Sequence, residues 1–120
     1  MKIRIAIAWV AVSVAACDAP GEGRNFERAR REAEAVMAAL SRYRTDAARY
    51  PQRLDAMSPR YLPQGFFEAN RPGRATTYFD FRRVDAGTYD FAFGYDGPGM
   101  NHCDYIRGTA PPRWDCSGRY

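Results

Sequence analysis

The residues best suited to chemistry gather between positions 94 and 105, in the stretch GYDGPGMNHCDY. Ca²⁺ takes oxygen ligands, and this stretch offers the side chains of Asp96, Asn101 and Asp104. A calcium site needs six to eight oxygens, however, and the spacing matches no EF-hand. A turn broken by Gly and Pro, with solvated Asp side chains, is the simpler interpretation. We expect no resident metal or cofactor, and these three residues are the candidates if calcium binds.

His102 stands beside Cys103, which raises the question of a zinc site or a Cys/His nucleophile. Zinc needs four ligands at regular spacing, and the chain contains one His. A hydrolase site would have to use His102 as its base, and no Gly-x-Ser-x-Gly turn is present. A disulfide at Cys103 would remove its thiolate. Because nucleophile, base and orienting group cannot all be named, the sequence predicts that the protein is not an enzyme.

The N-terminal segment has the layout of an export signal. A short basic start precedes an uncharged apolar run at 5–16, which is too short for a bilayer span of about 20 residues but suits a signal peptide. The run ends in VAAC, residues 14–17, which resembles the lipobox of bacterial lipoproteins. The resemblance implies that residues 1–16 are removed and that Cys17 is acylated. An ordinary signal peptide with an incidental cysteine is the alternative.

The lipoprotein resemblance also implies a location and a partner. Several acyl chains on Cys17 would anchor the protein to a membrane, facing the periplasm, without spanning the bilayer. Asp18 resembles the enterobacterial signal for retention at the inner membrane. With Cys17 lipidated, Cys103 and Cys116 remain as an even pair in an oxidising compartment.

The charge of the mature chain argues against nucleic acid as a partner. Removal of residues 1–16 takes Lys2 and Arg4 from the 18 basic residues and none from the 14 acidic ones, which leaves a net charge of +2. An exported chain with nearly balanced charge lacks the basic footprint of a nucleic-acid-binding protein.

The strongest periodic signal lies at 25–48 and predicts a long amphipathic helix, preceded by a flexible, lipidated tether at 17–24. Glu27 and Arg31 have the favourable i,i+4 order for an ion pair. Packing on a core is favoured over a membrane-surface or partner-binding helix. The apolar face comprises Phe26, Ala29, Ala33, Val36, Met37, Leu40, Tyr43 and Ala47.

A short helix is predicted after the long one, with Pro51 at its first position and Pro59 and Pro63 beyond its end. Aromatic and apolar residues on either side, at Tyr50, Tyr61 and Leu62, are expected to hold this segment to the long helix.

The remaining chain predicts two β-hairpins. Residues 76–84 and 88–95 alternate in polarity around the loop DAG, and the second strand has one wholly aromatic face, expected to lie on the long helix. The strands 103–107 and 112–116 can be paired so that Cys103 faces Cys116 and Tyr105 faces Trp114. Residues 25–120 are thus predicted to form one α+β domain, a long N-terminal helix packed on a small antiparallel sheet of hairpins, with one C-terminal disulfide.

The order of these elements resembles type IV pilins and type II secretion pseudopilins. The residues that carry the resemblance are ALSRYRTDAARYPQRLDAMSPRYLP at 39–63 and, more loosely, FGYDGPG at 93–99, a loop that often binds calcium in the major pseudopilin head. The chain departs from the family because it has no prepilin-peptidase site and no long apolar N-terminal helix. Ala48 also stands where these proteins often have Gly.

Together these features predict a membrane-anchored periplasmic lipoprotein that is not an enzyme. The expected role is a binding or assembly component of an envelope system of the secretion or pilus kind, with a protein of that system as partner. The alternative is a stand-alone periplasmic inhibitor or ligand-binding lipoprotein.

Overall fold

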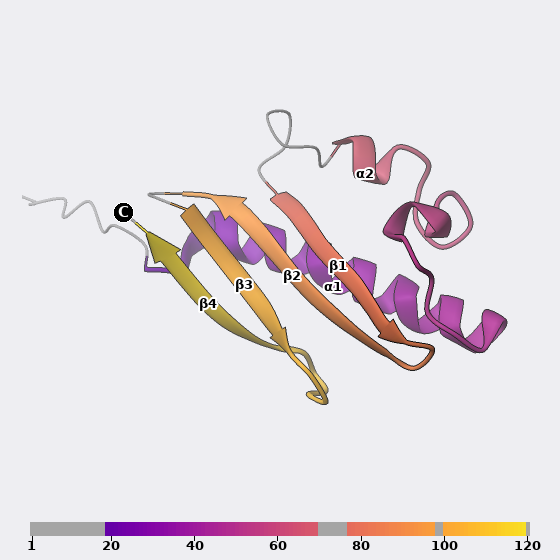
Figure 1. The fold of residues 1–120 in the computed structure, drawn as a ribbon. Helices are drawn as coiled ribbons and strands as arrows, with labels where there is room; N and C mark the ends of the chain where they lie inside the picture. The colour runs from indigo at the N-terminus through magenta and orange to yellow at the C-terminus, as the bar shows by residue number, and fades with distance from the viewer. Residues whose placement is uncertain (1–18, 70–76, 98–99, 120) are drawn as a thin grey trace, which may run out of the picture.

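A computed structural model describes residues 19–69, 77–97 and 100–119 of the chain. The domain has one long helix on one face of a four-stranded antiparallel sheet, and the strands follow one another in chain order across the sheet (Figure 1). This confirms the predicted α+β fold. The elements are α1 (Gly23–Ala47), the 3₁₀ helix η1 (Leu54–Met57), α2 (Phe66–Ala69), β1 (Thr77–Asp85), β2 (Thr88–Asp96), β3 (Met100–Ile106) and β4 (Arg113–Arg119).

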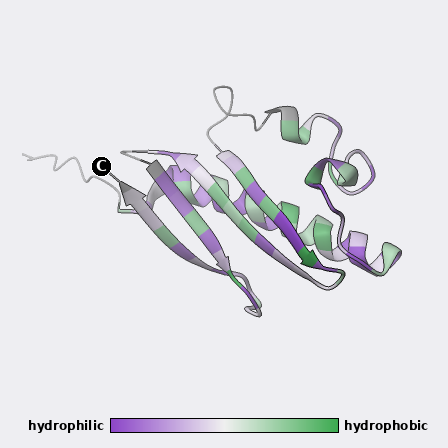
Figure 2. Ribbon diagram, viewed as in Figure 1, coloured by the Kyte–Doolittle hydropathy of each residue, from purple (hydrophilic) through white to green (hydrophobic). Residues whose placement is uncertain are grey.

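The core forms where the apolar face of α1 packs on the aromatic face of β2. Ala29 and Ala33 are fully buried in the same core cluster as Phe91 and Phe93, and small side chains at these positions allow the helix to lie close to the sheet. The Phe26 and Phe93 rings stack with centroids 6.1 Å apart. Figure 2 shows apolar and polar stretches following one another along α1, as expected for a helix buried on one side only.

The end of α1 has an unusual backbone. Ala48 follows the last helical residue with φ +60°, in the left-handed region, and its N–H bonds the carbonyl of Arg44 at 2.8 Å. This geometry closes many helices and favours Gly, because a Cβ is strained there.

The short helix begins later than predicted. It starts at Leu54 and not at Pro51, because the preceding chain is held against the β1–β2 turn. The Tyr50 N–H bonds the carbonyl of Ala86 at 3.0 Å, and the Tyr50 carbonyl accepts a bond from Arg83 at 3.2 Å.

Tyr61 holds the next segment to α1, as predicted. Its hydroxyl donates to the carboxylate of Asp46 at 2.6 Å, and its ring meets the Tyr43 ring edge-on. The helix α2, which follows, was not predicted.

Both predicted hairpins are present, and the second has the predicted register. In the first, Phe79 lies opposite Phe93 and Phe81 opposite Phe91. In the second, Cys103 lies opposite Cys116 and Tyr105 opposite Trp114.

Candidate functional site

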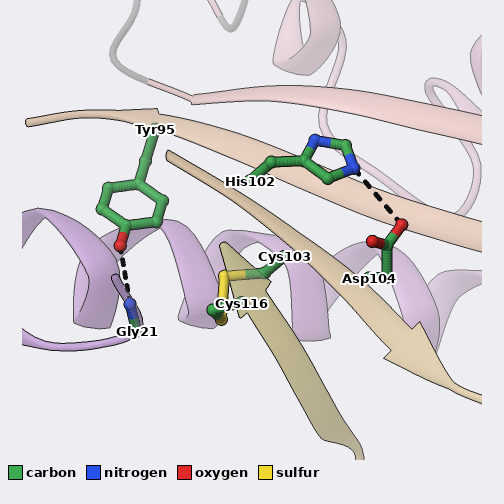
Figure 3. The surroundings of a disulfide bond; sticks show 6 residues. All are labelled: Gly21, Tyr95, His102, Cys103, Asp104 and Cys116. Carbon is green, nitrogen blue, oxygen red and sulfur yellow. Dashed lines mark hydrogen bonds and ion pairs between the residues drawn. A yellow bond between two sulfur atoms is a disulfide. The ribbon is translucent and has the colours of Figure 1, made fainter. Parts of the chain in front are cut away.

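The N-terminal linker is docked on the disulfide end of the sheet (Figure 3). Cys103 and Cys116 are bonded, with Cα atoms 4.0 Å apart, as the sequence predicts. The backbone N–H of Gly21 donates to the Tyr95 hydroxyl at 2.9 Å. Gly21 has φ +83°, a backbone conformation that favours Gly. A Cβ added there would also lie only 3.2 Å from the Cβ of Cys116, which is a second reason for Gly at this position.

Because of this contact, the flexible tether predicted at 17–24 does not extend as far as residue 24. Residues 19–22 form a turn closed by a bond from the Glu22 N–H to the Ala19 carbonyl at 3.0 Å, and α1 already begins at Gly23. Cys17 and Asp18 lie outside the described residues. From Gly21 back to Cys17 the chain has four residue steps, which reach at most about 14 Å.

The three calcium candidates do not converge on one site. Asn101 is buried on the helix-facing side of β3, in line with Cys103, whereas Asp104 is exposed on the opposite side. Asp96 is exposed at the end of β2, opposite Met100. In the described ranges no group of three or more His, Cys, Asp or Glu residues is placed to hold a metal ion.

His102 lies on the sheet face that α1 leaves open. Its Nε2 is 3.2 Å from the Asp104 carboxylate (Figure 3), and Ser117 lies opposite it on β4. A serine hydrolase needs the base to bond the nucleophile, and in the described residues no hydrogen bond joins Ser117 to His102. The side chain of Cys103 points into the core, and its sulfur is in the disulfide.

The open side of the sheet, which we call the outer sheet face, is charged. An open hollow of about 490 Å³ lies on it. Asp90 is held there by Arg82 at 2.7 Å and by Arg107, which directly follows β3. The hydrogen bonds from Arg82 and Arg107 lower the pKa of the Asp90 carboxyl. The outer sheet face comprises Tyr78, Asp80, Arg82, Asp90, His102 and Asp104.

Tyr78 packs its ring over Gly94, its partner on the neighbouring strand. A Cβ at Gly94 would lie 1.9 Å from the ring of Tyr78, so only Gly allows this contact. The ring covers part of the strand surface that would otherwise lack a side chain.

Tyr89 lies on the other side of the sheet, among aromatic rings. Its ring is 4.7 Å from that of Tyr50 and 6.0 Å from that of Tyr105. Burial, with smaller contributions from the two neighbouring tyrosines, raises the pKa of its hydroxyl far above the ordinary value. The hydroxyl therefore stays protonated, which favours a packing role over acid–base chemistry.

The sequence interpretation missed two features of this region. The linker contact joins Gly21 to Tyr95 across 74 positions, and a Gly-containing stretch carries no signal for such a contact. The Asp90–Arg107 pair depends on the alignment of the two hairpins with one another. The period-2 pattern gives the face on which each residue lies, but it does not give that alignment.

The chain matches no protein-family model, no curated protein and no solved structure. In the part of the chain that the structure describes, no helix combines the length and the apolar character needed to cross a bilayer.

Proposed function

We propose that this protein is a lipid-anchored periplasmic lipoprotein, held at the inner membrane through Cys17, that binds or assembles with a component of a secretion or pilus-like envelope system. The docking of Gly21 beside the disulfide supports this proposal best. It ties the end of the chain that would carry lipid to an ordered domain, so that the domain is presented at a fixed place near the bilayer. The proposed role is binding and not catalysis.

The outer sheet face is the surface that we assign to the partner. Four of its six residues are exposed and two are partly buried, it carries both signs of charge, and it lies on the side of the sheet away from α1. Charges of both signs on an open surface favour a specific protein partner, because complementary charges select a partner and its register. The fold order of helix, hairpin and disulfide hairpin, which resembles a pseudopilin head, supports an envelope assembly as the setting.

The lipid anchor is tested by Cys17→Ser. Cells are fractionated, and the wild-type protein is expected in the inner-membrane fraction while the variant leaves it. Continued membrane association of the variant would contradict the anchor. A Cys103→Ser/Cys116→Ser variant is the control, because it removes two cysteines and leaves Cys17 in place.

The partner is tested by photo-crosslinking in cells. A photoreactive amino acid is placed at Asp80, on the outer sheet face, and in a matched strain at Ala38, an exposed position on α1. Capture of secretion or pilus subunits from position 80 and not from 38 would support the proposal. Capture of a hydrolase would favour the alternative, a stand-alone periplasmic inhibitor.

A further inference from the structure

Three arginines form one side of the first two turns of α1. Arg24, Arg28 and Arg31 follow one another at spacings of four and three residues, which places them along one side of a helix. Arg24 and Arg31 are exposed and Arg28 is partly buried. We call these three residues the arginine patch. They border an open hollow of about 600 Å³, together with Gly23, Asn25 and Glu27.

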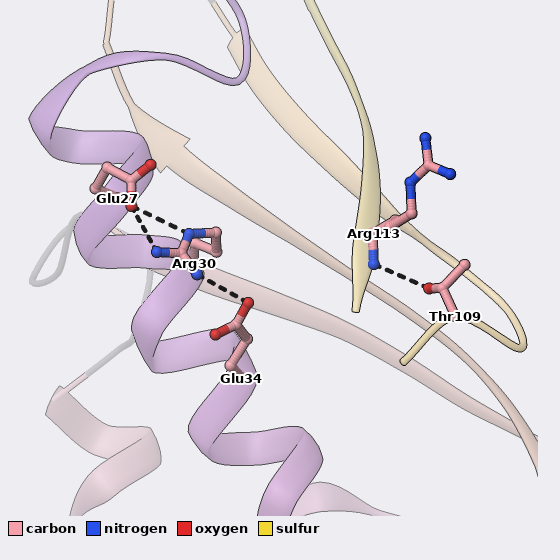
Figure 4. Close-up of polar contacts among 5 residues, drawn as sticks. All are labelled: Glu27, Arg30, Glu34, Thr109 and Arg113. Carbon is pink, nitrogen blue, oxygen red and sulfur yellow. Dashed lines mark hydrogen bonds and ion pairs between the residues drawn. The ribbon is translucent and has the colours of Figure 1, made fainter. Parts of the chain in front are cut away.

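Two carboxylates near these arginines, those of Glu27 and Glu34, bond a fourth arginine. Arg30 bonds Glu27 at 2.7 Å and Glu34 at 3.0 Å, on the neighbouring side of α1 (Figure 4). The hydrogen bonds that Arg30 donates to the carboxylates of Glu27 and Glu34 raise the pKa of its guanidinium, which therefore stays charged. The first turn of α1 contains no acidic residue. The positive end of the helix dipole adds to the positive electrostatic potential of the arginines there.

The patch is close to the end of the chain that would carry lipid. Gly21 is fixed to the sheet two residues before α1 begins. Cys17 lies at most about 14 Å of chain from Gly21, and Arg31 lies about 11 Å along the helix axis from Arg24. A bilayer that holds the lipid is therefore within reach of these arginine side chains.

We propose that the arginine patch binds the anionic phospholipid headgroups of the membrane to which Cys17 is attached, an inference that rests on the proposed lipid anchor. Guanidinium groups match phosphate oxygens with two parallel hydrogen bonds. A basic patch is a common second membrane signal beside an acyl chain. The contact fixes the first turns of α1 against the bilayer, so that the head does not swing about its linker.

The test uses the full-length lipidated protein in nanodiscs of phosphatidylcholine alone or of phosphatidylcholine mixed with phosphatidylglycerol. Hydrogen exchange is measured in peptides that cover residues 21–31, because the first helical N–H groups have no partner within the helix. The variant is Arg24→Gln/Arg31→Gln. The control is Arg53→Gln/Arg60→Gln, which removes the same charge from two exposed arginines beyond the other end of α1.

We expect slower exchange at 21–31 on the anionic discs than on the neutral ones. The variant should lose this difference, with the contact weakened about fivefold for each arginine removed, and the control should keep it. Equal exchange of the wild type on both kinds of disc would overturn the proposal. So would a control that loses the difference between anionic and neutral discs to the same extent as the variant. Release of the wild type from neutral discs would refute the lipid anchor itself, which separates that failure from failure of the patch.

Discussion

The hydroxyl oxygen of Tyr95 accepts a hydrogen bond from the backbone N–H of Gly21, which joins the end of the second strand to the linker ahead of α1. This bond attaches the linker residues just ahead of α1 to the domain. It can be removed by deleting one atom.

Tyr95→Phe is expected to lower the free energy of unfolding by about 1 kcal/mol, because the Gly21 N–H loses its partner in a partly buried place. Denaturant unfolding measures the change, and hydrogen exchange at Gly21 should rise. Tyr78→Phe is the matched control, because Tyr78 is exposed. An equal loss in both variants would mean that the bond to Gly21 contributes nothing specific.

The pair of Tyr78 and Gly94 can be tested by a double-mutant cycle. Gly94→Ala should lower stability by about 1 kcal/mol, because the new Cβ displaces the ring of Tyr78 from the strand. In a Tyr78→Thr background the same change should be neutral or stabilising, since Ala is better than Gly in a strand once the ring is gone. Equal effects in both backgrounds would show that the ring does not occupy this place.

Neighbouring alanines at the end of α1 should respond to Gly with opposite signs. Ala48→Gly is expected to raise the free energy of unfolding by about 0.5–1 kcal/mol, because Ala48 has φ +60° and Gly relieves that strain. Ala47→Gly, inside the helix, should lower it by about 0.5–1 kcal/mol. Both positions are exposed, so packing does not confuse the comparison. A loss in both variants would contradict the left-handed geometry.

Asp90 should make stability depend on pH in acid. Its pKa is lowered in the folded protein by Arg82 and Arg107, so its contribution is present above the unfolded-state pKa of about 3.9 and is lost as pH falls through the lower folded-state value. The stability difference between wild type and Asp90→Asn should therefore shrink across that range. In an Arg82→Gln/Arg107→Gln background this pH dependence should disappear, and its persistence would refute the assigned cause.

The disulfide should account for a large share of the domain's stability. Reduction, or Cys103→Ala/Cys116→Ala, is expected to lower the free energy of unfolding by about 3 kcal/mol, because the bond closes a loop 13 residues apart in sequence. Mass analysis without reductant should recover the peptides of Cys103 and Cys116 linked together. Free thiols at both positions would contradict the pairing.

The sequence predicts local structure in this protein better than contacts between distant segments. The helix at 25–48 corresponds to α1 at Gly23–Ala47, since a long apolar period of 3.6 is hard to mistake. The register of Cys103 on Cys116 follows from the alternation of faces within one hairpin. The partner of Glu27 was predicted as Arg31, and the structure has Arg30 instead, because i,i+3 and i,i+4 neighbours are equally near on a helix.

The candidate sites were harder to predict, because they depend on how the elements lie together. Asp96, Asn101 and Asp104 are close in sequence, yet the alternation of a strand sends Asn101 and Asp104 to opposite faces. Asp90 and Arg107 are 17 positions apart and meet only because β2 pairs with β3. Such contacts need the arrangement of the hairpins, which no short sequence pattern specifies.

The place where the linker meets the sheet also decides how the domain would respond to tension. In the proposed anchored state, a pull on the lipid enters the fold at Gly21, between the hydroxyl of Tyr95 and the sulfur-bearing side chain of Cys116. The hydrogen bond can rupture, whereas the covalent bond to Cys103 keeps β3 and β4 together. The linker is then expected to detach from the domain first. The connection between the lipid and the domain becomes longer, while the disulfide hairpin of β3 and β4 stays closed.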